Sequence, residues 1–302
     1  MTQHHHRNRR DDIVPNLFIV GAAKAATSSL YTILRQHTDI FFPSDANKEP
    51  AFFSTLYGMN DLRAYLQLYE NATGYERFFG DASTVYLTDP SSANLIYEYN
   101  SDARIVIMLR DPVTRAYSLY NWMVQEGFEY SPTFEKALAN EKIRRTKAIP
   151  NILEPEYYYD YLYFESGLYH AQLKKYFNLF AKENIYICLF EDFVADPDRE
   201  IKKLLKFLGL EQNFQYESAL VNKSRAVTFP FLSFSLRYIS KAIFSFYTPK
   251  SKAQRDYLIR LTWSHNAPKP MKDATRLLLK ERYLDDIARI EQDFNINLRD
   301  WK

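Results

Sequence analysis

Two segments of the chain share one order of hydrophobic and polar positions. Residues 17–30 form an apolar run that ends in a loop around Lys24 and continues as a helical pattern from Thr27, the predicted N-cap. Residues 104–118 form an apolar run that ends at Arg110 and also opens a helix. Helix N-termini present unpaired N–H groups and partial positive charge, so two of them at one edge of a parallel sheet suit an anion with two phosphate ends. This pattern favours a nucleotide ligand.

The start of the second predicted helix is well defined. Asp111 can cap the helix with its carboxylate, and Pro112 suits the first helical position, where a missing N–H has little effect. Ser118 then falls inside this helix.

Short apolar runs and helical patterns alternate along the rest of the chain. Helices are predicted over residues 61–69, 167–180, 199–208 and 272–294, and extended segments over 40–43 and 184–190. Residues 81–86 are typical of a loop or a short strand before a helix near Pro90. The alternation predicts an α/β fold, with a largely parallel, P-loop-like sheet, helices on both faces, and ligands beyond the carboxyl ends of the strands.

The last predicted helix has an apolar face. Its expected buried positions are Leu278, Tyr283, Ile287 and Ile290.

Composition limits the classes of protein that fit this pattern. The chain has 302 residues, 46% of them hydrophobic, so we expect a polar tail over residues 1–14 and a single domain over 15–302. A formal net charge of +2 is too small for a general nucleic-acid binder. Cys188 is the only cysteine, which excludes an intramolecular disulfide and a cysteine-based zinc cluster and suits a reducing compartment.

The N-terminal tail is polar and lacks the apolar region of a signal peptide, so we expect a cytoplasmic protein with no membrane partner. Histidines at positions 4–6 lie in this tail without ligand partners nearby, which favours a solvated tail over a metal site. The apolar stretch over residues 229–247 contains Arg237 and Lys241, so we expect an aromatic helix over the core or a mobile lid rather than a membrane span.

Four motifs follow one another along the chain. They are Gly21-Ala-Ala-Lys-Ala-Ala-Thr-Ser28, Lys48-Glu-Pro-Ala-Phe-Phe53, Leu109-Arg-Asp-Pro-Val-Thr-Arg-Ala-Tyr-Ser118, and Leu189-Phe-Glu-Asp-Phe193 with Asp196-Pro197. In this order and spacing they resemble the sulfotransferases that use 3′-phosphoadenosine 5′-phosphosulfate (PAPS), in the branch with glycan sulfotransferase domains and bacterial relatives. The resemblance implies the sulfotransferase fold, sulfuryl transfer from PAPS to a hydroxyl or amine, release of 3′-phosphoadenosine 5′-phosphate (PAP), and no required metal.

The resemblance also implies a role for each motif. The cofactor contacts that it implies are Lys24, Ala25, Ala26, Thr27, Ser28, Arg110, Ser118 and, through a looser match, Arg225. Lys24 would lie at the bridging oxygen, where electrostatic stabilisation can be worth ~3 kcal/mol. Arg110 would hold the 3′-phosphate in a two-pronged contact that lysine could not copy.

Glu49 is the predicted catalytic base. A base that accepts the acceptor's proton typically contributes about 100- to 10,000-fold in rate. Each of these roles has a structural alternative. A Glu-Pro carboxylate can be a solvated loop residue, and Arg110 can pair with Asp111 or Asp81.

One position departs from the family pattern. The family usually has glycine where Ala26 stands, and glycine is favoured where backbone approaches a phosphate or takes a positive φ. Either the loop keeps a negative φ at Ala26, or the phosphate lies farther out. The loop is also not a Walker A motif, because Lys24 precedes Thr27 by three residues instead of adjoining it. This difference disfavours the main enzyme alternative, a P-loop ATP-dependent kinase.

A second alternative is a noncatalytic nucleotide-binding protein of the same fold. The presence of both Lys24 and Glu49 disfavours it, because a binding protein needs phosphate contacts but no base. His37 and His170 are further candidates for the base, since some small-molecule sulfotransferases use histidine. Their positions, at a helix end and in an apolar helical segment, favour capping or packing.

Residues 154–165 combine acidic and aromatic side chains without any Lys or Arg. The family resemblance implies that this region lies near the acceptor. The predicted acceptor contacts are Lys48, Tyr158, Asp160 and Glu165. Such a surface suits a cation, so we expect a small-molecule acceptor, for example a guanidinium alkaloid of the saxitoxin type, over an anionic glycan. The same segment also fits an ordinary tyrosine-rich edge of the core.

Overall fold

The computed structural model describes most of the chain as two compact units. The described residues are 13–44, 48–56, 59–146, 155–217, 226–227, 230–243, 256–264, 266 and 268–301. Unit 1 comprises Met1–Arg110 and Gln172–Val221, and unit 2 comprises Asp111–Ala171 and Asn222–Lys302.

Unit 1 contains a five-stranded parallel sheet. Its strands are β1 (Leu17–Gly21), β2 (Ile40–Phe41), β3 (Phe78–Asp81), β4 (Arg104–Leu109) and β5 (Ile185–Leu189), in the spatial order β2-β3-β1-β4-β5. Every residue of β1 is buried, and so is every residue of β4 except Arg104. Continuous apolar runs of this kind form strands that are covered on both faces, which confirms the predicted α/β fold.

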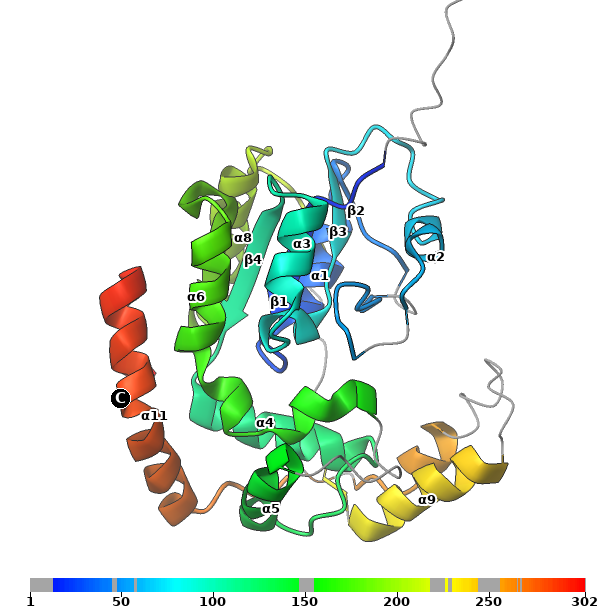
Figure 1. Cartoon of the computed structure of the whole chain (residues 1–302), viewed down its shortest axis with the longest axis vertical. Coiled ribbons are helices and arrows are strands. Elements are labelled where there is room, and N and C mark those ends of the chain that lie inside the picture. Colours follow the sequence, from blue (N-terminus) through cyan, green and yellow to red (C-terminus); the bar gives the residue numbers. More distant parts are fainter. Residues whose placement is uncertain are drawn as a thin grey trace, which may run out of the picture. The chain divides into compact units, whose positions relative to one another are not determined.

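The helices of unit 1 connect and cover these strands. They are α1 (Thr27–Leu34), α2 (Leu62–Gln67), α3 (Ser92–Tyr99), α6 (Tyr169–Leu179, which starts in unit 2), α7 (Phe190–Ala195) and α8 (Pro197–Leu208), with 3₁₀ turns η3 (Thr84–Leu87) and η6 (Lys182–Asn184). The chain moves from β1 to β2 in one direction and from β3 to β4 in the other, so right-handed crossovers put α1 and α3 on opposite faces. Figure 1 shows α3 in front of the sheet and α1 behind it.

Unit 2 is helical. Its elements are α4 (Pro112–Gln125), α5 (Phe134–Thr146), α9 (Pro230–Ile243) and α11 (Asp273–Phe294), with 3₁₀ turns η4 (Pro155–Tyr161), η5 (Glu165–Gly167) and η7 (Arg299–Trp301). The α4 cap is as predicted, because the Asp111 carboxylate accepts hydrogen bonds from Val113 N at 3.1 Å and Thr114 N at 3.4 Å.

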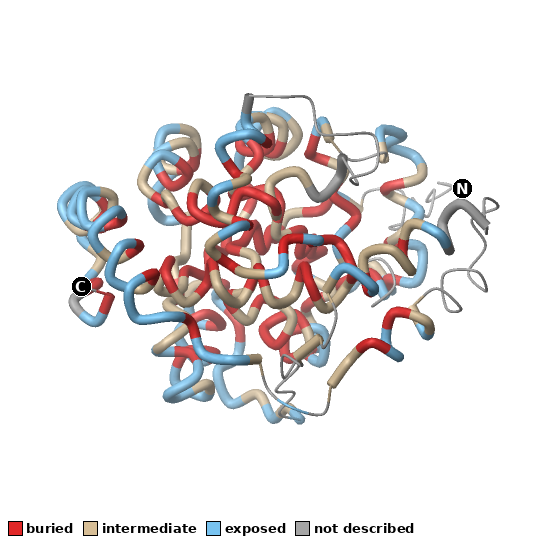
Figure 2. The backbone as a smooth tube through the Cα atoms, turned by 90° about the horizontal axis from the view of Figure 1, so that it is seen from below, coloured by how far each residue is buried: buried red, intermediate tan, exposed pale blue. Residues whose placement is uncertain are grey.

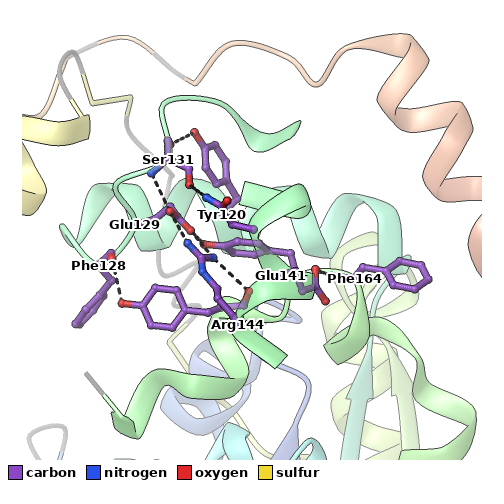
Figure 3. Close-up of polar contacts among 10 residues, drawn as sticks. Tyr120, Phe128, Glu129, Ser131, Glu141, Arg144 and Phe164 are labelled. Atoms are coloured by element: carbon purple, nitrogen blue, oxygen red, sulfur yellow. Dashed lines mark hydrogen bonds and ion pairs between the residues drawn. The ribbon is translucent and has the colours of Figure 1, made fainter. Parts of the chain in front are cut away.

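Unit 2 contains a buried ion pair (Figure 3). Both carboxylate oxygens of Glu129 accept from Arg144, at 2.8 and 2.9 Å. Tyr163 Oη and Ser131 N donate to the same carboxylate at 2.6 and 2.8 Å. Arg115, in α4, is also buried and donates to Tyr163 O and Ser166 Oγ. These contacts join α4 and α5 to the segment between η4 and η5.

Helix α11 has the predicted length but a different buried face. Leu278, expected in the core, is 52% exposed, whereas its neighbour Leu279 is fully buried. The predicted burial of Tyr283, Ile287 and Ile290 is correct. The alternation of buried and exposed residues along the helix that leads to the C-terminus is visible in Figure 2. Two adjacent leucines cannot both face the core, and packing selects the one four residues before Tyr283.

Other differences concern element boundaries. Residues 81–86 are neither one loop nor one strand, because Asp81 ends β3 and Thr84 begins η3. Strand β3 and helix α5 were not predicted. In the apolar stretch 229–247, residues 230–243 form α9, and residues 229 and 244–247 lie outside the described part of the chain, as do residues 1–12 of the predicted tail. No helix among the described residues is both long and apolar enough to cross a membrane.

Candidate functional site

The loop after β1 has an unusual backbone conformation. Lys24 and Ala26 adopt left-handed backbone conformations, with φ of 69° and 65°. The alternative in which the loop keeps a negative φ at Ala26 is therefore wrong. A left-handed conformation costs a non-glycine residue roughly 1–2 kcal/mol, and such strain tends to cluster at functional sites.

The start of α1 also differs from the sequence prediction. Ala26 is the N-cap residue, Thr27 is the first helical residue, and no side chain caps the helix. Thr27 as N-cap is therefore wrong, and the reason is the left-handed turn at Ala26. Leu30 N bonds to Ala26 O at 3.1 Å, whereas Ala25 N bonds to Ala22 O at 3.2 Å.

These two bonds distinguish between the loop N–H groups that were predicted to contact the cofactor. The N–H groups of Ala26, Thr27 and Ser28 precede the first bond within the helix, which is the position at which N–H groups can bind an anion. The Ala25 N–H is held inside the loop by the Ala22 carbonyl, so it is less suited to this role than predicted. Thr27 is 4% exposed, and Ser28 is more accessible.

Arg110 lies directly after β4, next to the loop of Lys24. Its Nη1 donates to Lys24 O at 3.0 Å, and its guanidinium lies 4.3 Å from the centre of the Phe190 ring. β1 and β4 are adjacent, and their following segments lead to opposite sides of the sheet, which makes this edge the topological switch point. A ligand site is expected at that point in an open parallel sheet.

Glu49 lies in the loop between β2 and α2, and both of its carboxylate oxygens are engaged. Oε1 accepts from Lys48 Nζ at 2.7 Å, and Oε2 accepts from Thr84 Oγ1 at 2.9 Å and Thr84 N at 3.2 Å. Desolvation would raise the pKa of Glu49, but the Lys48 ammonium and the Thr84 donors outweigh it and lower that pKa. Glu49 is therefore ionised at neutral pH, and its side chain stays 42% exposed.

Lys48 is more enclosed than the carboxylate it binds. Its side chain is 13% exposed, and Nζ lies 3.5 Å from Ala82 O and 5.9 Å from the centre of the Tyr31 ring. The acceptor contact predicted for Lys48 stays a prediction. What the structure adds is an ion pair with Glu49.

The end of β1 and the Glu49 loop meet at η3. A Cβ at Gly21 would lie 2.8 Å from Thr84 O and 2.8 Å from Leu87 Cβ, so only glycine, here with φ of +143°, allows this approach. Thr84 binds Glu49, and Lys24 lies three residues after Gly21. The tertiary structure thus brings the Lys24 loop, the Glu49 carboxylate and Arg110 to one edge of the sheet in unit 1.

The other predicted site residues belong to unit 2. Ser118 lies within α4 and is partly buried. Tyr158 and Asp160 lie in η4, and Tyr158 packs edge-on against Tyr159 at 5.2 Å. Arg225 lies outside the described residues.

Glu165 already has a cationic partner. Arg145 Nη1 donates to Glu165 Oε1 at 2.6 Å. Tyr161 and Tyr163, from the same aromatic segment, are fully buried beside the Glu129–Arg144 pair. This part of the segment therefore fits a core edge.

The two candidate histidines have structural partners. His37 is 6% exposed, accepts from Asp39 N through Nδ1 at 3.1 Å and packs on Phe214. His170 pairs with Asp293 at 2.7 Å through Nε2. Capping and packing, as expected, describe both.

Thr84 and Phe190 support the site and were not predicted. Thr84 follows a strand end and is flanked by Ser83, and Phe190 follows the last residue of β5. Both follow the carboxyl ends of strands, where functional residues are expected. Their partners, however, are 35 and 80 residues away in sequence, so the contacts could not be predicted.

A parallel sheet with a cationic loop, a helix N-terminus and an arginine at its carboxyl edge defines an α/β protein suited to a phosphorylated ligand. The sulfotransferase domain profile matches residues 14–233, a range that includes parts of both units. This chain belongs to the sulfotransferase family, as the four motifs indicated.

Comparisons with individual proteins agree. A crystal structure of a sulfotransferase from Alicyclobacillus acidocaldarius is 31% identical and superposes with a TM-score of 0.71, covering 96% of this chain and 99% of that one. Carbohydrate sulfotransferase 15 from Homo sapiens is 24% identical over 273 residues, 74% of this chain and 48% of the relative. Heparan sulfate glucosamine 3-O-sulfotransferase 3B1 from Homo sapiens is 25% identical over 212 residues, 70% of this chain and 50% of the relative. The chain spans half or less of the length of these curated relatives.

Proposed function

We propose that this chain transfers a sulfuryl group from PAPS to a hydroxyl or amine of an acceptor. One observation supports this most directly. The Glu49 carboxylate is ionised, partly exposed and oriented by Lys48 and Thr84, in the same unit as the Lys24 loop and Arg110. A phosphate-binding protein without catalysis would need no such carboxylate.

Each residue then has a defined task. When bound, PAPS supplies an activated sulfuryl group joined to its 5′-phosphate. Lys24 and the N–H groups of Ala26, Thr27 and Ser28 bind and stabilise the 5′ end, where charge increases during transfer. Arg110, whose guanidinium lies beside the Phe190 ring, binds the 3′-phosphate. Ser118 and Arg225 are further cofactor contacts that the family resemblance implies.

Glu49 accepts the proton of the acceptor. Oε1 retains a lone pair beyond the one used by Lys48, whereas Thr84 uses both acceptor positions of Oε2, because each carboxylate oxygen has about two such positions. Lys48 limits the basicity of Glu49 and keeps it ionised, so proton acceptance is available at neutral pH.

For the acceptor we propose a small molecule with a cationic group, such as a guanidinium alkaloid of the saxitoxin type, bound by Lys48, Tyr158, Asp160 and Glu165. Carboxylates and aromatic faces bind such cations at ~1–2 kcal/mol per contact. A cation would compete with Arg145 for Glu165, so Asp160 and Tyr158 are the stronger part of this proposal.

A second candidate acceptor is a glycan. Two of the relatives are named for carbohydrate and heparan sulfate, and the Arg145–Glu165 pair lowers the negative charge that would repel a sulfated chain. Competition between matched cationic and anionic acceptors, with PAP release as the readout, decides between them. A preference for heparan-like chains would overturn the small-molecule proposal.

The test of the function itself combines PAP binding with turnover. Calorimetry should detect PAP binding to the wild-type chain and to Glu49→Gln. Turnover of Glu49→Gln should fall about 100- to 10,000-fold, because the base is removed but the Thr84 contact is kept. Glu76→Gln is the matched control, since Glu76 also has a lowered pKa from backbone donors but lies outside the site. Absence of PAP affinity in the wild type would overturn the proposal.

The kinase alternative predicts a different cofactor requirement. Among the described residues, no group of three or more His, Cys, Asp or Glu side chains could hold a metal ion. We expect full PAPS-dependent turnover in the presence of a chelator, whereas a P-loop kinase would need Mg²⁺ and consume ATP.

A further inference from the structure

Asp81, the last residue of β3, is a buried carboxylate without a cationic partner in its hydrogen bonds. It is fully buried, and four donors converge on it. Oδ1 accepts from Ser83 N at 3.0 Å and Ser83 Oγ at 2.6 Å. Oδ2 accepts from Tyr86 Oη at 2.8 Å and Tyr65 Oη at 3.0 Å. Arg110, considered above as its partner, instead bonds to the Lys24 carbonyl.

Two of these hydroxyls also bind the loop that contains Glu49. Ser83 Oγ accepts from Ala51 N at 2.9 Å, and Tyr86 Oη accepts from Phe53 N at 3.3 Å. Ala51 has a φ of +51°, so this loop holds a strained residue two positions after Glu49. The loop conformation therefore depends on bonds that originate at Asp81.

The direction of these bonds follows from the charge on Asp81. A hydroxyl has one proton, and an ionised carboxylate can only accept. Ser83 and Tyr86 therefore donate hydrogen bonds to Asp81, and their lone pairs accept hydrogen bonds from the N–H groups of the loop. If Asp81 were protonated, one of its oxygens would donate instead, and the hydroxyl that accepts from it would have to turn its own proton elsewhere; Ser83 and Tyr86 are two of the three hydroxyls in reach.

We propose that Asp81 is a positioning residue for sulfuryl transfer: through Ser83 and Tyr86 it sets the conformation of the loop that presents Glu49. The next residue along the chain from Ser83 is Thr84, which binds Glu49 directly. One segment thus holds both the loop backbone and the carboxylate of the base. This inference rests on the proposed function for its consequence in catalysis, but its structural part is independent of any acceptor.

The groups that face Asp81 make its state sensitive to pH. Ser83 precedes η3, Tyr86 lies in η3, and Tyr65 and Tyr69 lie on or just after α2, with Tyr69 Oη donating to Gly80 O at 3.0 Å. Burial raises the pKa of all three tyrosines, so they remain donors at neutral pH. Burial also raises the pKa of Asp81 from 3.8 to about 6. Protonation near that pH disrupts the bond directions.

Two tyrosine variants form a matched pair. Tyr86→Phe and Tyr65→Phe each remove one hydroxyl donor from the same oxygen of Asp81. Only Tyr86 also binds the loop, whereas Tyr65 touches it through ring packing that phenylalanine keeps. We expect Tyr86→Phe to lower amide protection at Phe53 and kcat about tenfold, the scale of one lost hydrogen bond, with Tyr65→Phe within about threefold of wild type. Equal effects of the two variants would overturn the proposal.

The pH profile gives the second test. Wild-type kcat and the amide protection factors at Ala51 and Phe53 should both fall as the pH drops through about 6. Asp81→Asn should have lower protection and kcat at pH 7, about tenfold, and should lose the step near pH 6. A variant with wild-type protection and an unchanged profile would overturn the positioning role.

The readouts separate this inference from the proposed function. PAP affinity should stay within about threefold of wild type in Tyr86→Phe, because the phosphate contacts are elsewhere. If the wild type transfers no sulfuryl group, the proposed function fails, but amide protection still tests the loop. If transfer occurs but substitution of Asp81 or Tyr86 changes neither amide protection nor kcat, only this inference fails.

Discussion

Asp81 in unit 1 and Glu129 in unit 2 are both fully buried carboxylates, and they are held in different ways. Asp81 in unit 1 accepts only from hydroxyls and one backbone N–H, and burial raises its pKa to about 6. Glu129 in unit 2 is just as buried, but the Arg144 guanidinium and the other donors outweigh desolvation and lower its pKa.

The difference shows what a buried charge can be used for. Glu129 and Arg144 neutralise each other, so the pair fixes the packing of α4, α5 and the aromatic segment at all ordinary pH values. No cation is among the hydrogen-bond partners of Asp81 in the described part of the chain, so its ionisation is costly, and its protonated and ionised forms have similar free energies near pH 6. That balance lets Asp81 affect the Glu49 loop, whereas Glu129 is suited to a structural role.

The largest expected effect comes from breaking the ion pair. Arg144→Met should lower the free energy of unfolding by about 3–5 kcal/mol, because Glu129 is left buried and uncompensated. At ~2–4 °C per kcal/mol, the melting temperature should drop by roughly 10 °C. Calorimetry or thermal circular dichroism measures both.

Its control is the double variant Glu129→Gln with Arg144→Met. Removing both charges should restore most of the lost stability, since the penalty arises from the unpaired charge. A double variant as unstable as Arg144→Met would show that the arginine contributes through packing alone.

The second prediction concerns pH. The folded-state pKa of Asp81 is raised, so its favourable contribution is complete below pH 3.8 and is lost as the pH rises through about 6. The unfolding free energy of wild type relative to Asp81→Asn should therefore fall by about 3 kcal/mol between pH 3.8 and 7. Urea titrations across this window measure the change.

Glu129 should give the opposite slope. Its folded-state pKa is lowered, so its contribution is present above pH 4.5 and is lost as the pH falls through the folded-state value. Wild type should lose stability relative to Glu129→Gln only below pH 4.5. Slopes of the same sign for both carboxylates would contradict the comparison.

A smaller effect is expected at Ser83. Ser83→Ala removes the hydroxyl that donates to Asp81 and accepts from Ala51, and should cost about 1–3 kcal/mol. Hydrogen exchange of Ala51 should rise in parallel. The control Ser131→Ala, in unit 2, keeps the backbone N–H that binds Glu129 and should cost less.

The smallest effect concerns backbone strain. Among the described residues, positive φ at non-glycine positions occurs at Lys24, Ala26 and Ala51 in unit 1 and at Asn295 in unit 2. Ala26→Gly should change stability by at most about 1 kcal/mol, in the stabilising direction, because glycine tolerates this conformation. A clear loss of melting temperature would mean that the Ala26 methyl group, not the backbone, matters there.

Much of unit 1 was predictable because its signals are local. The apolar run before Lys24, the Asp111–Pro112 helix start and the stop at Gly209, whose φ is +66°, all act within a few residues. Strand β3 was missed because Phe78–Asp81 is short and gains its order from neighbouring strands.

The predicted site residues divide in the same way. Lys24, Glu49 and Arg110 were predicted from motifs, and the structure brings their segments together. The partners of Glu165 could not be predicted, because Arg145 lies on another element and the pairing depends on tertiary contacts. The same holds for Leu279, which replaces Leu278 in the core.

The sequence by itself determined most of the alternation of strands and helices, the loop cations and the family, since these depend on hydrophobic periodicity and short-range chemistry. Only the tertiary structure decided which polar groups form hydrogen bonds and ion pairs with one another. Asp81 and Ala51 are 30 residues apart and are joined through one hydroxyl, and the direction of that bond exists only when all its partners are in place.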